Sequence, residues 1–154
     1  SYIHNQAAPG MGKIGVLVAL EGAGNKDELN AFGRMLAMHI AATNPVSLDL
    51  ASVPADVLAR EQAILEEKNA GKPANVMEKI IASGLKSYAK ENCLLDQAYV
   101  HDGSKTVAQA IAEAGNKAGC GVALKAFSRM QLGEGIEKGA DDFAAEVAKM
   151  SGQG

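Results

Sequence analysis

Three histidines and two cysteines are the residues of this sequence with the most versatile chemistry, because imidazoles and thiolates bind metals and act in catalysis. His4, His39 and His101 fall in different predicted elements, and no two have the i, i+4 spacing with which a helix presents a metal-binding pair. Cys93 and Cys120 are isolated, and neither has a histidine close to it in the sequence. We therefore predict two reduced thiols, no metal site and no enzyme active site.

Two glycine-rich stretches have the composition of phosphate-binding loops but not their spacing. Residues 10–13 read Gly-Met-Gly-Lys, yet Ile14 stands where such a loop has serine or threonine, and the stretch leads into a predicted strand. After Gly-Glu-Gly at residues 133–135, Lys138 occupies the position of the third glycine of a dinucleotide fingerprint. Both stretches are predicted to be turns, and no cofactor is expected.

The composition excludes further classes of function. The 154 residues carry a net charge of −3 and include no tryptophan, so we expect no direct nucleic-acid partner. No apolar run approaches the roughly 20 residues of a membrane helix, and the first residues do not resemble a signal peptide. We expect no membrane contact, and a location in the bacterial cytoplasm or an organelle matrix. The first residue is Ser1, not methionine, and a predicted strand follows at once, which suggests a fragment or a processed product.

The helix that we predict over residues 26–43 has two apolar strips and ends at Asn44-Pro45, since proline cannot continue a helix. The core-facing strip consists of Leu29, Phe32, Leu36, Ile40 and Thr43. The flanking strip consists of Met35, Met38, His39 and Ala42. We predict that this flank, with its imidazole turned outward, grips another protein. The alternative is that His39 is a boundary residue satisfied by its own neighbours.

The remaining pattern alternates strands with helices. A short strand at residues 2–4, a loop at 5–12 and a strand at 13–20 are predicted to form a hairpin. The second strand has apolar or small residues on both faces, so it is predicted to be a central strand covered by helices. Ser104 is predicted to cap a helix over residues 105–114, and a further strand is predicted over residues 122–132.

Residues 54–90 have the pattern of two helices joined by a Gly-Lys-Pro turn at 71–73. They are predicted to form an antiparallel helical hairpin that projects from the domain; two ordinary core helices are the alternative. The fold class is therefore α+β, a small antiparallel sheet covered by helices, with its core at residues 1–53 and 91–136. A C-terminal module at 137–154 is predicted to contain a short helix with Phe143 and Val147 on its apolar side.

Several of these segments together carry a resemblance to a known family. The run AMHIAATNP at residues 37–45 follows the strand KIGVLVAL and precedes the helical segment that begins SVPADVLAR. Four further runs come in the family's order: CLLDQAYV, SKTVAQAI, LGEGIEK and DFAAEVAKM. In this order they resemble translation elongation factor Ts, the guanine-nucleotide exchange factor of the GTPase elongation factor Tu.

The resemblance implies a protein that binds elongation factor Tu and promotes GDP release through a shaped surface, without a catalytic group. It implies that His39 touches the GTPase and that the final helix, with Phe143 and Val147, packs on the nucleotide-binding domain of the GTPase. It covers only the second half of the family's core and the C-terminal module, so the family's Asp-Phe wedge would lie upstream of Ser1. We therefore expect a fragment that is competent to bind but weak in exchange.

A different class of function is the alternative. The same core half resembles what is called the dimerisation domain in some members of the family. In this case the chain would be a structural module that forms homodimers, with the helical hairpin pairing with a second copy, and it would have no exchange activity.

Overall fold

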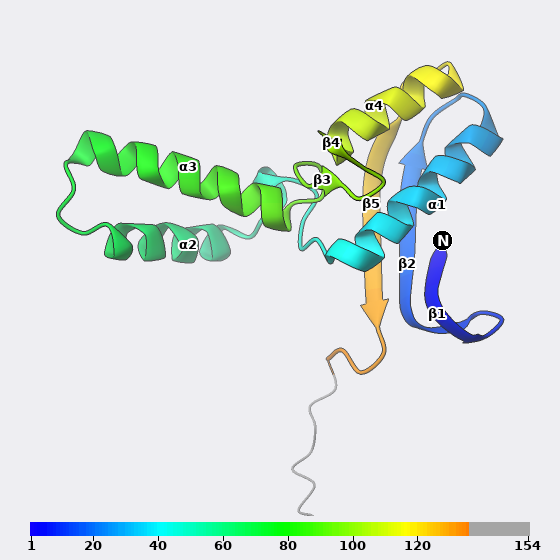
Figure 1. Ribbon diagram of the computed structural model, residues 1–154, viewed down its shortest axis with the longest axis horizontal. Coiled ribbons are helices and arrows are strands. Elements are labelled where there is room, and N and C mark those ends of the chain that lie inside the picture. Colours follow the sequence, from blue (N-terminus) through cyan, green and yellow to red (C-terminus); the bar gives the residue numbers. More distant parts are fainter. Residues whose placement is uncertain (136–154) are drawn as a thin grey trace, which may run out of the picture.

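A three-stranded antiparallel sheet with two helices on one side forms the body of the computed structural model, which describes residues 1–135 (Figure 1). The strands are β1 (Tyr2–Ala8), β2 (Met11–Glu21) and β5 (Ala123–Gln131), in the order β1-β2-β5. The helices over the sheet are α1 (Lys26–Thr43) and α4 (Val107–Ala118). The predicted α+β class is confirmed, whereas the C-terminal module at 137–154, with Phe143 and Val147, lies outside the described residues.

The hairpin between β1 and β2 is longer than the sequence pattern predicted. Most of the predicted loop at residues 5–12 is strand, and pairing continues through His4↔Ile14 and Gln6↔Gly12. Two glycines explain this, since Gly10 has a φ of 78° that suits the tight turn. A Cβ on Gly12 would collide with the Ile3 side chain and the His4 carbonyl, so glycine allows the strands to pair there.

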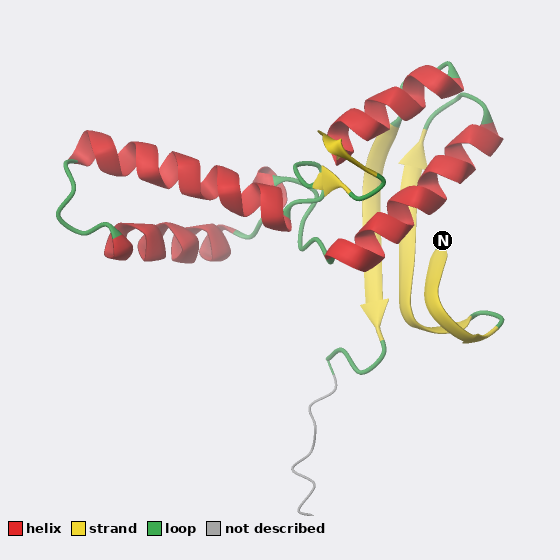
Figure 2. Ribbon diagram, in the orientation of Figure 1, coloured by secondary structure: helices red, strands yellow, loops and turns green. Residues whose placement is uncertain are grey.

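Only one face of the sheet is covered by helices within residues 1–135. Val16 is buried under α1, and Val18 and Leu20 pack beside it in the same core. On the opposite face Leu17 is 53% exposed and Met130 is 58% exposed. The predicted central strand covered by helices is β2, and within residues 1–135 both covering helices, α1 and α4, lie on the same side of the sheet (Figure 2).

The core lies between the sheet, α1 and α4, and it includes the tyrosine of a small second hairpin. This hairpin pairs β3 (Ala98–Tyr99) with β4 (Asp102–Thr106). The buried apolar residues of the core are Val16, Phe32, Leu36, Ala37, Ile40, Ala41, Leu94, Tyr99, Val107, Ala110, Ile111 and Ala114.

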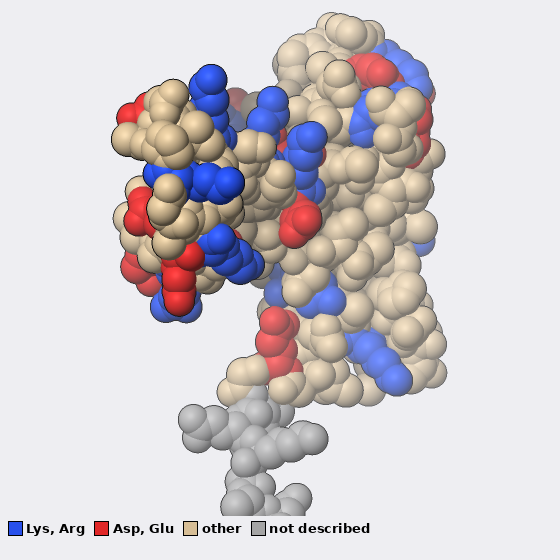
Figure 3. All heavy atoms as spheres, turned by 60° about the vertical axis from the view of Figure 1, so that its left-hand side comes forward, with Lys and Arg blue, Asp and Glu red and all other residues tan. Residues whose placement is uncertain are grey.

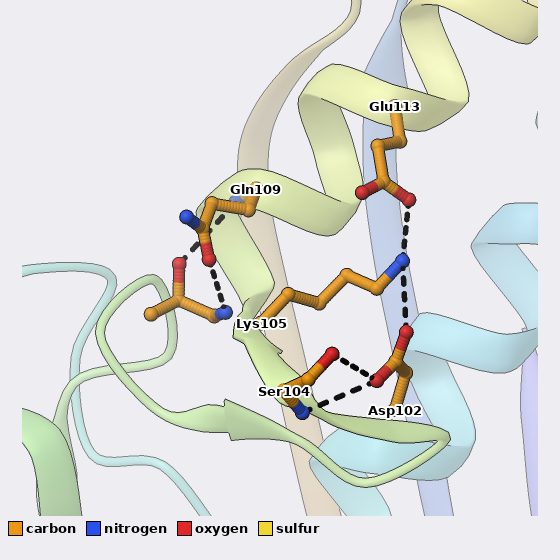
Figure 4. A network of polar contacts seen from close by, with 6 residues as sticks. Asp102, Ser104, Lys105, Gln109 and Glu113 are labelled. Carbon is orange, nitrogen blue, oxygen red and sulfur yellow. Dashed lines mark hydrogen bonds and ion pairs between the residues drawn. The ribbon is translucent and has the colours of Figure 1, made fainter.

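The start of α4 is set by a capping box (Figure 4). The Thr106 side chain accepts a hydrogen bond from the Gln109 N–H, and the Gln109 side chain accepts one from the Thr106 N–H. Ser104, the predicted cap, donates its hydroxyl to Asp102 instead. The helix also runs through Gly115 and ends at Ala118, and Gly119, with a φ of 73°, is its C-cap. The predicted bounds of this helix, 105–114, were therefore wrong at both ends.

A helical arm extends away from the sheet (Figure 1). It consists of α2 (Ala55–Lys68) and α3 (Ala74–Asn92), and these two helices confirm the predicted hairpin. Each helix is preceded by a proline. A Cβ on Gly84 would collide with Leu65, so this glycine lets the two helices approach closely. Charged side chains gather on the arm in the space-filling view (Figure 3). No helix within residues 1–135 is long and apolar enough to cross a membrane.

Candidate functional site

The flank of α1 that the sequence pattern singled out is an exposed apolar surface, apart from its histidine. Asn25 caps the helix through hydrogen bonds from the Asp27 and Glu28 N–H groups, and Asn44 ends it in a left-handed conformation. One side of the helix packs into the core. On the flank, Met35 is 41% exposed and Met38 is 37% exposed. Ala42 is also exposed.

His39 does not face solvent, which corrects the prediction that its ring is turned outward. Its exposed fraction is 0%. At about 100° per residue, His39 lies within roughly 60° of Leu36 around the helix, so it falls at the edge of the buried strip. The β3–β4 hairpin covers this edge. Because residues 97–101 come about 60 positions later in the chain, the local pattern around His39 did not reveal this cover.

Both nitrogens of the His39 ring form hydrogen bonds. The Val100 N–H donates to Nδ1 at 3.2 Å, so Nε2 carries the proton and donates to the Gln97 side-chain oxygen at 2.9 Å. The Thr43 hydroxyl lies 2.9 Å from the same Gln97 oxygen, and the Gln97 amide nitrogen donates to the Glu91 carbonyl at 2.8 Å. His39 therefore ties α1 to the β3–β4 hairpin and to the end of α3.

Burial also keeps the imidazole neutral. The desolvation of the ring lowers the pKa of His39 below its ordinary value, the hydrogen bond to Gln97 acts in the opposite direction, and the His101 charge lowers the pKa further. The Tyr99 ring lies between the two histidines, with centroid distances of 5.8 Å to His39 and 5.0 Å to His101. The histidine is thus part of a packed aromatic cluster.

The turn between β3 and β4 extends the exposed surface. His101 donates its Nε2 proton to the Met35 carbonyl at 3.0 Å, and the backbone of Val100 is held by His39, so the turn lies along α1. The Val100 side chain is 49% exposed. We call the surface formed by Met35, Met38, Ala42 and Val100 the α1 flank. Sequence reasoning did not identify Val100, since only the folded chain brings it to the helix.

The other chemically versatile side chains lie apart from this surface. His4 forms a hydrogen bond with the Tyr2 hydroxyl at 2.9 Å, on β1. Cys93 is buried and its pKa is raised by desolvation and then by the charges of Asp96 and Asp49, and Cys93 and Cys120 are both free thiols. No group of three histidine, cysteine or acidic side chains in the described part of the chain could hold a metal ion.

Comparison with known proteins gives one consistent family. The family model described as Elongation factor TS matches residues 1–134. Elongation factor Ts of Methylobacterium radiotolerans is 60% identical over 154 residues, which cover 99% of this chain and 50% of that relative. Elongation factor Ts of Methylorubrum populi is 60% identical over 152 residues, covering 98% of this chain and 50% of that relative. Elongation factor Ts of Xanthobacter autotrophicus is 55% identical over 153 residues, with coverages of 99% and 50%.

The extent of these matches defines what the similarity covers. The chain spans about half the length of the curated relatives it matches. The family model, in contrast, extends over almost all of the residues that the structure describes. The chain belongs to the elongation factor Ts family.

Proposed function

We propose that this chain binds elongation factor Tu through the α1 flank. The proposal rests on two observations. The Met35, Met38 and Val100 side chains are exposed, and the backbone of Val100 is held against α1 by a hydrogen bond to the buried His39 ring. Exposed apolar side chains on a rigid support are typical of protein-binding surfaces, and methionine adapts to the shape of a partner. Membership of the family supports the choice of partner.

The proposed activity is the promotion of GDP release by linkage. A protein that binds the nucleotide-free GTPase more tightly than the GDP-bound form must weaken GDP binding by the same factor. This mechanism needs complementary surface and no catalytic group, cofactor or metal. Because this chain spans half the length of its relatives, we propose that it supplies part of the binding surface and accelerates release weakly by itself.

In this proposal His39 is a positioning residue. The ring is buried, so it stabilises the β3–β4 turn against α1, and the turn in turn presents Val100. Removal of the ring should disturb binding through the turn, whereas a substitution of Met38 should disturb it directly. Phe143 and Val147, which lie outside the described residues, remain predicted contacts of the GTPase.

The test is the release of a fluorescent GDP analogue from elongation factor Tu, with binding measured in parallel by calorimetry. Met38→Glu places a charge in the α1 flank and should weaken binding at least about tenfold. Met11→Glu is the matched control, since Met11 is an exposed methionine at the tip of the β1–β2 hairpin. The assignment of the surface would be contradicted if the unmodified chain binds and the two variants lose affinity equally. It would also be contradicted if neither variant loses affinity.

A homodimer is the second candidate function, and it is favoured by the face of the sheet that no helix within residues 1–135 covers (Figure 2). This face has no charged residue across its central rows, which contain Gly15, Leu17, Ala19, Ala126, Ser128 and Met130. Apolar sheet faces of this kind pack against another sheet at about 10 Å. We propose that a dimer, if it forms, uses this face and not the charged helical arm.

Sedimentation velocity separates the two candidates. Leu17→Lys should abolish a dimer that uses the sheet face, while Val76→Lys on the exposed side of α3 should not. A dimer that survives Leu17→Lys and is lost with Val76→Lys would place the contact on the arm. If the chain is a monomer and binds elongation factor Tu, the homodimer is ruled out and the first candidate function remains.

A further inference from the structure

A cleft of about 310 Å³ lies between α1 and α4, next to the α1 flank. Small side chains leave room for the cleft, because its lining includes Ala31 on α1 and both Ala110 and Ala114 on α4. Its lining also includes the rings of Phe32 and Tyr99, which are almost completely buried. The cleft is therefore apolar within, and its volume is at the lower end of the range for binding pockets.

Among the residues that line the cleft, Tyr99 carries a buried hydroxyl of an unusual kind. Tyr99 is 5% exposed, and its oxygen is buried with no hydrogen-bond partner within residues 1–135. A buried hydroxyl without a partner destabilises a protein by about 1 to 3 kcal/mol, so most such groups are paired. Burial raises the pKa of Tyr99, and the Lys105 charge acts in the opposite direction, so the hydroxyl stays protonated and can donate.

The rim of the cleft is charged but balanced. Lys105 forms an ion pair with Asp102 at 3.0 Å and another with Glu113, so it is held across one end of the cleft (Figure 4). Glu28 and Lys117 also line the cleft. With two acidic and two basic side chains in the lining, the formal charges cancel. A neutral occupant fits this rim better than an ion, which would lose its hydration without a net opposite charge.

Met35 connects the cleft to the proposed binding surface. It lines the cleft and also belongs to the α1 flank. Its side chain is long, unbranched and flexible, so it can move aside when a partner side chain enters the cleft. A partner that covers the α1 flank would therefore also lie against Met35 at the cleft.

We propose that the cleft receives one apolar side chain of the GTPase, and that the Tyr99 hydroxyl donates a hydrogen bond to a carbonyl oxygen next to that side chain. This inference rests on the proposed function, because it names the anchoring contact within the same interface. It assigns to Tyr99 a role that appears only in the complex. An anchor in a desolvated pocket with one polar group at its base has the features of an interaction hot spot.

The test measures the affinity of the chain for nucleotide-free elongation factor Tu by calorimetry, with two variants that act on the cleft differently. Tyr99→Phe removes only the hydroxyl and should weaken binding about fivefold, the equivalent of one lost hydrogen bond. Ala31→Leu fills the cleft from the exposed side of α1 and should weaken binding at least about tenfold. Ala112→Leu, on the outer side of α4, is the matched control and should bind like the wild type.

Stability of the free chain separates a binding role from a structural one. Removal of an unpaired hydroxyl should leave the free chain as stable as before or more stable, so weaker binding with unchanged stability supports the proposal. If both Tyr99→Phe and Ala31→Leu bind with wild-type affinity, the proposed role of the cleft is overturned and the proposed function stays intact. Absence of a complex with the unmodified chain would overturn both.

Discussion

The helical arm and the α1 flank are stabilised in opposite ways. In the arm, α2 has no buried residue and α3 buries only Ala89, and the two helices lie next to each other in the sequence. At the α1 flank, His39 is completely buried by residues about 60 positions away. The arm therefore depends on local contacts, whereas the flank depends on the closure of a long loop.

The two regions should therefore differ in local stability. A thinly packed arm should open at low free energy, while the elements around His39 should open only when the domain unfolds. A binding surface on the second kind of element is already ordered before the partner arrives. Less conformational entropy is then lost on binding.

The largest expected effect comes from truncating matched leucines in the two regions. Leu36 is completely buried in α1, so Leu36→Ala should destabilise the chain by about 4 kcal/mol. Leu65 in α2 is only half-buried, so Leu65→Ala should cost roughly 1 kcal/mol. Urea unfolding followed by circular dichroism measures both. Equal losses would show that Leu65 is packed as tightly as Leu36, contrary to the contrast between the arm and the core.

His39→Ala should have the next largest effect, about 3 kcal/mol. It leaves the Val100 N–H without its acceptor in a buried site and removes a donor to Gln97. A double-mutant cycle with Gln97→Ala in urea unfolding should give a coupling of about 1 kcal/mol. Additive losses would mean that the two side chains are independent, contrary to the hydrogen bond between them.

The start of α4 gives a smaller effect. Thr106→Ala removes the capping box and should destabilise the chain by about 1 kcal/mol, measured by thermal unfolding. Ser104→Ala removes only a hydrogen bond to Asp102 on the surface and should cost less than about 0.5 kcal/mol. The reverse order of the two losses would restore Ser104 as the cap that the sequence pattern suggested.

The smallest effect is a dependence of stability on pH. Because burial lowers the pKa of His39 from 6.5, the unfolded chain takes up a proton more readily than the folded chain. The contribution of His39 is therefore fully present above pH 6.5 and is lost progressively below it. Unfolding free energies at pH 7.5 and 5.5 should differ more in the wild type than in His39→Asn. The same difference in both would assign the pH dependence to other groups.

The sequence predicted the local elements well. The bounds of α1 and the two helices of the arm follow from apolar periodicity, from the proline before each arm helix and from Asn44-Pro45. Errors arose where two local signals competed. Ser104 and Thr106 are both good caps, and the reciprocal partner Gln109 selects Thr106. Gly115 could break a helix, but here it lies within α4, where the absence of a side chain lets the Cys120 carbonyl approach closely.

The candidate site was predictable only in part. The periodicity of α1 identified Met35, Met38 and Ala42 as an exposed strip. It did not show that His39 is covered or that Val100 joins the surface, because both depend on the packing of the β3–β4 turn against α1. Helical periodicity gives the direction of a side chain, and only tertiary structure shows what lies there.

Hydrogen exchange measured by mass spectrometry, with and without elongation factor Tu, tests the central claim most directly. Binding through the α1 flank should slow exchange in residues 35–42 and 98–102 and leave exchange in the arm, residues 55–92, unchanged. Slower exchange confined to the arm, with no change around the α1 flank, would contradict this claim.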